Sequence, residues 1–309
     1  MNKPYISVVI PVYNEEGNVE QLFERTTKTM DALGKPYEFI LVNDGSRDKS
    51  YEILERLYQS RKDITKVINL NGNFGQHMAV LAGFELSTGN IIITLDADLQ
   101  NPPEEIPKLI AEMEKGYDLV SGVRQKRKDN WFRRHASRMI NRIRDRITHI
   151  EMSDHGCMLR AYSRQIIDMI VESNEASMFI PALAYSFAQN PTEIPVLHNE
   201  RATGESKYSL YALIRLNFNL MTGYSLVPLQ AFTAMGLVIS FLSILFVIYL
   251  FLRRIFIGPE AQGVFTLFAI LFFLVGIVLM GLGIMGEYVG RIYQEVRRRP
   301  RYAIKQVLQ

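Results

Sequence analysis

Cysteine is nearly missing from this chain: among its 309 residues there is one, Cys157. A single thiol excludes a disulfide within the chain, on which many proteins outside the cytoplasm depend. The net charge is also small, at +3, and no stripe of basic and aromatic residues marks a nucleic-acid surface. We therefore expect a functional part that faces the cytoplasm and no nucleic-acid partner.

Charged residues are absent from two long stretches, 216–252 and 261–286. Each exceeds the roughly 20 apolar residues that cross a bilayer. We therefore predict two transmembrane helices, near 229–252 and 264–286, which form a hairpin over 229–286. Two buried core helices are the alternative, but they would need a much larger soluble domain around them.

Basic residues predict the orientation of this hairpin. The basic tail 287–309 has six cations, and two flank the short loop between the helices. By the positive-inside rule, both termini face the cytoplasm and the loop lies on the far side of the membrane. The tail cations are Arg291, Arg297, Arg298, Arg299, Arg301 and Lys305, and those at the loop are Arg253 and Arg254.

Residues 1–207 have the pattern of a soluble α/β domain. Short apolar runs alternate with stretches whose apolar residues recur at helical spacing. Continuous apolar strands separated by helices predict a mainly parallel sheet that is covered on both faces. The predicted strands are 6–10, 38–42, 66–70, 91–95 and 119–123, and the predicted helices are 17–33, 50–59 and 76–86.

Acids, amides and glycines follow four of these strands. The segments are PVYNEE, NDGS, NGNFG and DAD, in chain order. Each is an acceptable turn by itself. Ligands bind beyond the carboxyl ends of parallel strands, so four such turns at one edge predict a site. The glycine motifs of dinucleotide folds and P-loop NTPases do not occur in the sequence.

The acids Asp96 and Asp98 follow an apolar strand directly. In extended chain their side chains point to the same side, roughly 6–7 Å apart. Two carboxylates so placed repel each other unless a cation lies between them. The alternative is a solvated turn that caps the helix after Pro102 and Pro103.

Four motifs, in this order, resemble the family 2 glycosyltransferases of GT-A fold that load sugars onto polyprenyl phosphates: VVIPVYNEE, ILVNDGSRD, LDADLQNPPE and ERATGESKYS. The resemblance covers essentially the whole chain, both apolar stretches included. It implies an inverting, metal-dependent transferase at the cytoplasmic face of a bacterial inner membrane, with a UDP-sugar as donor and undecaprenyl phosphate as acceptor. The family resemblance also allows a homotetramer.

The implied sugar rests on further segments, among them FGQHMAVLAGF, DHGCMLRAYSR and GEYVGRIYQEVRRRPRY. They are similar to family members that transfer 4-deoxy-4-formamido-L-arabinose for lipid A modification, with Gln76 and His77 as polar groups near the sugar. A glucosyl or other hexosyl donor stays open. An inactive membrane scaffold and a processive synthase are alternatives from other classes, but the synthase usually has a Q-x-x-R-W element, which this chain lacks.

The resemblance implies that Asp98 and Gln100 bind Mg²⁺ or Mn²⁺, with Asp96 on the nucleotide-sugar side or in a water-bridged contact. Carboxylate and amide oxygens suit these ions, which would neutralise the diphosphate leaving group. The implied nucleotide-binding residues are Pro11, Tyr13, Glu15, Asp44 and Asp96. Read singly, Tyr13 would be a surface packing residue and Asp44 a turn residue.

Asp154 is implied to be the general base or the acid that orients the acceptor. A polyprenyl phosphate is already an anion, so little proton removal is needed, and a turn aspartate before a strand is the alternative. Arg124 and Arg133 are implied to bind the acceptor phosphate, unless they belong to a solvated basic face. A closing loop would stabilise the diphosphate with Arg201, Ser206 and Lys207.

Residues 131–147 have the pattern of a basic amphipathic helix that begins with Trp131. Such a helix is typical of a segment that lies in the lipid headgroup plane, with an ordinary surface helix as the alternative. We predict that residues 208–228 form a second interfacial helix that leads into the membrane.

Overall fold

The computed structural model describes most of the chain, in two compact units. The described residues are 3–124, 152–154, 156–173, 179–199, 227–258, 263–297 and 300–309. Unit 1 comprises residues 1–138, 150–207 and 299–309, and unit 2 comprises 139–149 and 208–298. The helix expected at 131–147 and nearly all of the segment 208–228 lie outside the described residues and stay predictions.

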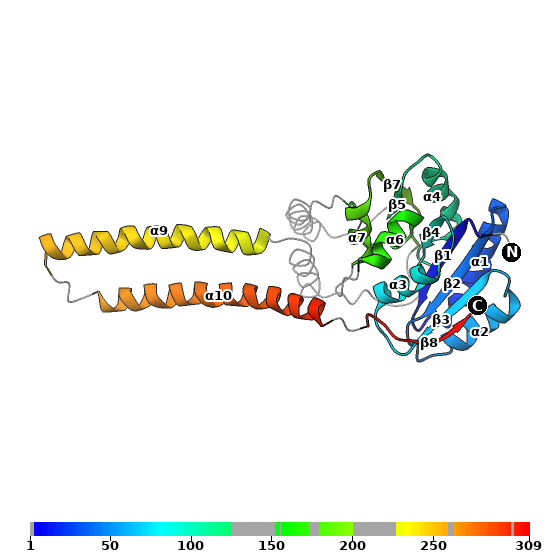
Figure 1. Ribbon diagram of the computed structural model, residues 1–309, viewed down its shortest axis with the longest axis horizontal. Helices are drawn as coiled ribbons and strands as arrows, with labels where there is room; N and C mark the ends of the chain where they lie inside the picture. Colours follow the sequence, from blue (N-terminus) through cyan, green and yellow to red (C-terminus); the bar gives the residue numbers. More distant parts are fainter. Residues whose placement is uncertain are drawn as a thin grey trace. The chain divides into compact units, whose positions relative to one another are not determined.

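An eight-stranded sheet forms the centre of the described part of unit 1, in the order β7-β5-β6-β4-β1-β2-β3-β8 (Figure 1). Strands β4, β1, β2 and β3 are parallel neighbours, whereas β6 and β8 run antiparallel to theirs. The predicted α/β class with a mainly parallel sheet is confirmed. The strands are β1 (Ile6–Val12), β2 (Tyr37–Asn43), β3 (Thr65–Leu70), β4 (Ile91–Thr94), β5 (Leu119–Arg124), β6 (Arg160–Ser163), β7 (Pro191–Val196) and β8 (Ile304–Leu308).

Helices cover both faces of the sheet, because side chains along each strand alternate between two apolar clusters. Val8 and Ile10 of β1 belong to the cluster shared with α1, α2 and α4, and Val9 belongs to the one shared with α3, α6 and α7. The helices are α1 (Val19–Leu33), α2 (Ser50–Ser60), α3 (Gln76–Leu86), the short 3₁₀ turn η1 (Pro103–Glu105), α4 (Ile106–Met113), α6 (Arg164–Glu172) and α7 (Ile180–Phe187).

The C-terminal segment adds an edge strand that the charge pattern did not predict. Strand β8 pairs antiparallel with β3, and the N–H of Asn71 donates to the carbonyl of Ala303 just before it. Arg301 donates to the carbonyl of Val171, and burial together with a hydrogen bond to Glu85 raises the pKa of Tyr302. Part of the segment read as a basic tail is therefore built into the sheet domain.

Unit 2 contains two long helices, α9 (Val227–Phe256) and α10 (Val264–Val296). Within α10, Ile270–Tyr293 is long and apolar enough to cross a membrane, whereas the apolar stretch found in the described part of α9, Leu229–Ile239, is shorter. The membrane passage of α9 stays a prediction.

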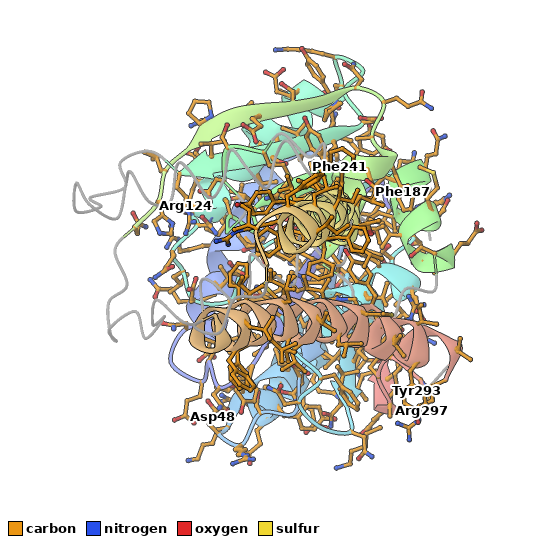
Figure 2. All side chains as sticks on the ribbon, turned by 90° about the vertical axis from the view of Figure 1, so that its left-hand side faces the viewer. Asp48, Arg124, Phe187, Phe241, Tyr293 and Arg297 are labelled. Carbon is orange, nitrogen blue, oxygen red and sulfur yellow. The ribbon has the colours of Figure 1, made fainter. Side chains whose placement is uncertain are left out.

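Near the C-terminal end of α10 an arginine lies over a tyrosine ring. The guanidinium of Arg297 lies 5.8 Å from the centre of the Tyr293 ring, and Figure 2 labels both side chains. Tyrosine rings and arginines are common where an apolar helix meets the headgroups.

Candidate active site

The loops after β1 and β2 are interlaced by hydrogen bonds. The N–H of Asn14 donates to Ser46 Oγ at 3.1 Å, and the N–H of Arg47 donates back to Asn14 Oδ1 at 2.8 Å. Asn14 has a φ of 55°, in the left-handed region that asparagine tolerates better than most residues. We call residues 11–16 and 43–50 together the loop edge, since they form one connected surface at the carboxyl ends of two parallel strands.

The loop edge presents the residues expected to bind the nucleotide. Tyr13 is 42% exposed, and Pro11 is half-buried within β1. The N–H of Glu15 donates to Ser50 Oγ, and its carboxylate accepts from Asn18 Nδ2 at 2.7 Å. An exposed aromatic ring beside an oriented carboxylate is an arrangement that a base and a ribose can use.

Asp44 is buried at the end of β2 and holds the loop that leads into α3. Its two carboxylate oxygens accept the N–H groups of Phe74 at 2.7 Å and Gly75 at 3.0 Å. Burial raises the pKa of Asp44, and the two N–H groups offset part of that rise. These contacts tie the loop edge to α3.

Gly45 permits a close approach beside Asp44. Its φ is 68°, and a Cβ there would lie 2.4 Å from the carbonyl carbon of Gly72. Only glycine fits this crossing of two loops.

Asp96 and Asp98 are half-buried at the end of β4. The amide of Gln76 donates to Asp96 Oδ1, and the N–H of Gln100 donates to Asp98 Oδ1 at 3.1 Å. Leu99, which follows Asp98, has a φ of 61°, a strained conformation for a leucine. The backbone thus bends sharply where the acids occur, a feature often found at functional sites.

The donor atoms at this bend fit a hard divalent cation. Asp96, Asp98 and Gln100 offer only carboxylate and amide oxygens, which Mg²⁺ and Mn²⁺ prefer. Among the described residues no three histidine, cysteine, aspartate or glutamate side chains cluster as a metal site. A cation here would complete its shell with water and phosphate oxygens, as Mg²⁺ commonly does with nucleotide substrates.

Arg124 and Asp154 form a bidentate ion pair at the same end of the sheet, since Arg160 is paired with both Thr94 of β4 and Ser121 of β5. Arg124 Nε lies 2.6 Å from Asp154 Oδ2, and Nη2 lies 2.7 Å from Oδ1. The Asp154 side chain is 6% exposed and that of Arg124, labelled in Figure 2, is 17% exposed. The hydrogen bonds that Arg124 donates to Asp154 raise the pKa of Arg124, with a smaller contribution from the charge of Asp96. Two residues expected to act separately are therefore one unit.

Arg160 is a buried residue that the sequence analysis missed. It is fully buried at the start of β6 and donates to the carbonyls of Cys157 and Asp154. A charged residue in a predicted core strand would have been a signal, but β6 itself was not predicted. We call Arg124, Asp154 and Arg160 together the arginine corner.

His77 lies in the first turn of α3, one residue after the glutamine that holds Asp96. Its ring packs edge-to-face on Phe179 at 5.0 Å, and its Nδ1 is buried without a hydrogen-bond partner among the described residues. Burial lowers the pKa of His77 to about 4, and the charge of Arg160 adds to the effect. The ring is therefore neutral at physiological pH.

Other expected residues are not placed. Arg133, Arg201, Ser206 and Lys207 lie outside the described residues, and their roles stay predictions.

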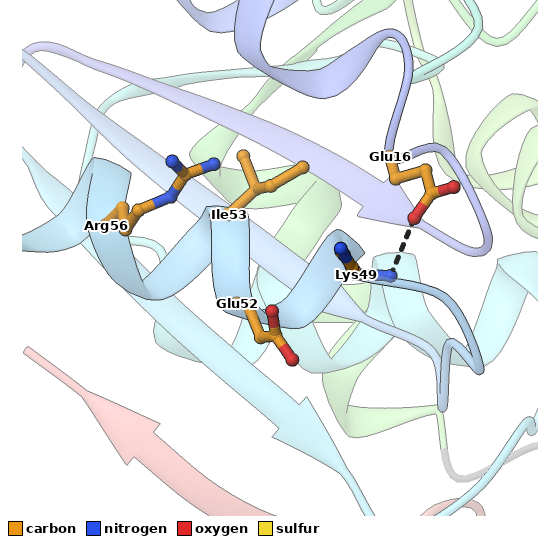
Figure 3. Close-up of a pocket in the computed structure, with 5 residues that line it drawn as sticks. All are labelled: Glu16, Lys49, Glu52, Ile53 and Arg56. Carbon is orange, nitrogen blue, oxygen red and sulfur yellow. Dashed lines mark hydrogen bonds between the residues drawn. The ribbon is translucent and has the colours of Figure 1, made fainter.

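A shallow depression lies beside the loop edge, where the N–H of Lys49 donates to the Glu16 carboxylate at 2.9 Å (Figure 3). Its two acids balance its two cations, so it offers no net charge to a diphosphate. It is lined by Glu16, Lys49, Glu52, Ile53 and Arg56.

Comparison with known proteins places these features in context. Residues 7–171 match the family model described as glycosyl transferase family 2. The chain is 50% identical over 306 residues to the undecaprenyl-phosphate 4-deoxy-4-formamido-L-arabinose transferase of Edwardsiella ictaluri, covering 98% of this chain and 94% of that protein.

Solved structures also resemble it. Glucosyl-3-phosphoglycerate synthase from Mycobacterium tuberculosis with Mg²⁺ and UDP has a TM-score of 0.48 at 15% identity, over 71% of this chain and 77% of that one. The mannosyltransferase PcManGT from Pyrobaculum calidifontis with GDP-Man and Mn²⁺ has a TM-score of 0.46 at 17% identity, over 76% and 65%.

Proposed function

The chain belongs to glycosyl transferase family 2, and on that premise we propose that it transfers 4-deoxy-4-formamido-L-arabinose from its UDP derivative to undecaprenyl phosphate. Half of all positions are identical to a relative named for that reaction, over nearly the full length of both chains. The observation that carries the proposal is the Arg124–Asp154 ion pair, which lies at the same end of the sheet as Asp96. The pair gives an anionic acceptor a cation next to the acids that serve the donor.

The reaction needs little acid–base chemistry from the protein. A phosphate oxygen of the acceptor attacks the anomeric carbon of the sugar, and the bond from that carbon to the diphosphate breaks. UDP leaves with the electron pair, and the configuration at the anomeric carbon inverts. Since the attacking phosphate is already an anion, no proton must be removed before attack.

The chain's own residues then bind and orient the two substrates. Tyr13 and Glu15 of the loop edge hold the uridine and ribose, and Arg124 attracts the acceptor phosphate. Asp98 and Gln100 would hold Mg²⁺ or Mn²⁺, which supplies positive charge against the diphosphate. Asp96 is fixed by Gln76 on the sugar side.

A membrane-bound acceptor requires the enzyme to work at a bilayer. We infer that α10 crosses the bacterial inner membrane, with α9 as the second pass, and that unit 1 faces the cytoplasm. A homotetramer is an arrangement compatible with this placement.

A donor panel tests the proposal. Purified full-length protein is incubated with undecaprenyl phosphate and either UDP-4-deoxy-4-formamido-L-arabinose, UDP-glucose or another UDP-hexose, with Mg²⁺, Mn²⁺ or chelator. Mass spectrometry of the lipid should show the formamido-pentosyl product, formed only with a divalent cation. A hexosyl product that forms faster would contradict the proposed sugar, and transfer in chelator would contradict the proposed metal.

A further inference from the structure

Arg160 is a full positive charge in the core of the sheet. Its side chain is fully buried, and among the described residues its hydrogen bonds go to neutral groups only. Burying a charge is costly unless it is well hydrogen-bonded, and apolar residues of similar volume often replace buried charges without loss of stability. An arginine here therefore calls for an explanation other than packing.

Two hydrogen bonds of Arg160 go to one short loop, and a third goes to the neighbouring strand. Nη2 donates to the carbonyl of Asp154 at 2.9 Å, and Nε donates to the carbonyl of Cys157 at 2.8 Å. Nη1 donates to Ser121 Oγ at 2.7 Å, on the neighbouring strand β5. The guanidinium thus fixes both ends of the segment 154–157 against the sheet.

That segment presents the Asp154 carboxylate to Arg124. Besides the two guanidinium contacts, Oδ2 accepts the N–H of Arg124 at 3.3 Å and Oδ1 accepts the N–H of Gly156 at 3.1 Å. A carboxylate has about four lone-pair sites, and these four donors fill them. These contacts place the Asp154 carboxylate where it orients Arg124.

We propose that Arg160 is a positioning residue for the acceptor phosphate, which acts through Asp154 to hold the guanidinium of Arg124 at the end of β5. This inference rests on the proposed function and assigns the arginine corner to the anionic headgroup of the acceptor. The N–H groups of Arg124 that do not bind Asp154 would donate to the acceptor, which is a phosphate monoester. A planar guanidinium is well suited to bind such a group.

Gly156 shows how closely the corner is fitted. A Cβ at this position would lie 2.7 Å from Arg124 Nη2, closer than side chains tolerate. A methyl group there would push the guanidinium out of place while leaving the charges of the corner unchanged.

Kinetics with the full-length enzyme test the proposal. Arg160→Lys keeps the positive charge, but one ammonium group cannot replace all three hydrogen bonds that the guanidinium donates. We expect the KM for undecaprenyl phosphate to rise about tenfold or more, while the affinity for UDP, measured by calorimetry, changes less than about twofold. Arg164→Lys is the matched control, because Arg164 also donates to backbone carbonyl and hydroxyl oxygens, namely those of Gly89 and Ser87. It should leave both values unchanged.

Two milder variants keep the test decisive if Arg160→Lys fails to fold. Ser121→Ala removes one bond to Arg160, and Gly156→Ala displaces Arg124; both should raise the acceptor KM severalfold with UDP affinity unchanged. Equal changes for donor and acceptor, or an unchanged acceptor KM in folded variants, would overturn the inference. Failure of the wild type to transfer any sugar to undecaprenyl phosphate would instead refute the proposed function.

Discussion

The loop edge and the arginine corner lie at the same carboxyl edge of the sheet but are built from different interactions. In the loop edge, side chains such as Asn14 and Ser46 are fixed by hydrogen bonds between adjacent loops. In the arginine corner, a nearly buried ion pair is supported by a third, fully buried charge. Losing a neutral hydrogen bond costs about 1 kcal/mol, whereas removing one partner of a buried pair costs about 3–5 kcal/mol. The first region should therefore tolerate substitution, and the second should not.

The largest effect on activity is expected at the bend after β4, which contains Asp98 and belongs to neither the loop edge nor the arginine corner. Asp98→Asn removes the charge that would hold the cation, so kcat should fall about 10³-fold, as expected for the loss of electrostatic stabilisation in the transition state. Asp48→Asn is the control. Asp48 is also a loop acid that accepts N–H bonds, from Glu16 and Ser50, but it follows β2 rather than β4 and is not among the expected metal ligands. Steady-state kinetics at saturating Mg²⁺ give kcat for both variants. Full activity of Asp98→Asn would show that Asp98 does not bind the metal.

The arginine corner gives the next largest effect. Asp154→Asn leaves Arg124 partly unpaired, so kcat/KM for the acceptor should fall about 10²-fold. If Asp154 orients Arg124 and takes no proton, as we propose, the residual activity should keep the shape of the wild-type pH–rate profile. If the acidic limb of that profile disappeared in the variant, Asp154 would be a general base after all.

A pH titration of stability tests the burial of His77. Its pKa is lowered from 6.5 to about 4 in the folded protein. Between these values the unfolded chain binds a proton that the folded protein excludes, so acid destabilises the wild type. Relative to His77→Gln, the free energy of unfolding should fall by about 2 kcal/mol between pH 7.5 and pH 5, since each pKa unit corresponds to about 1.4 kcal/mol. Parallel denaturant curves for the two proteins over this range would mean that His77 is solvated.

The smallest effect is expected in the loop edge. Asn14→Ala removes the hydrogen bond that the side chain accepts from the N–H of Arg47, and it disfavours the left-handed backbone at this position, at a cost of about 1–2 kcal/mol. The affinity for UDP should fall severalfold, while the acceptor KM stays within about twofold. Asn14→Gly keeps the backbone conformation and should bind UDP more tightly than Asn14→Ala. A large change in acceptor KM would show that the two regions are not independent.

The same contrast explains what could be predicted from the sequence. The loop edge follows strands whose apolar runs are unmistakable, and the predicted helix 76–86 coincides with α3. The arginine corner depends on β6, a strand of four residues that pairs antiparallel with both neighbours. Nothing local in the sequence marks that Arg124 meets Asp154, because the pairing is created by the sheet.

Other features escaped prediction for related physical reasons. The strand β8 is mostly exposed and mixes charged and apolar residues, so its pattern is weak until β3 is known to be its partner. The left-handed conformation of Leu99 runs against the preference of leucine and is imposed by the surrounding fold. Strain of this kind is not visible in composition or periodicity.

The antiparallel pairing of β8 with β3 has a consequence for biosynthesis. During translation, β3 emerges long before β8, and the residues of α9 and α10 are made in between. Until then one edge of the sheet presents unpaired backbone groups, which can associate with other chains. The edge of β3 therefore stays open to such association until residues 304–308 have been made.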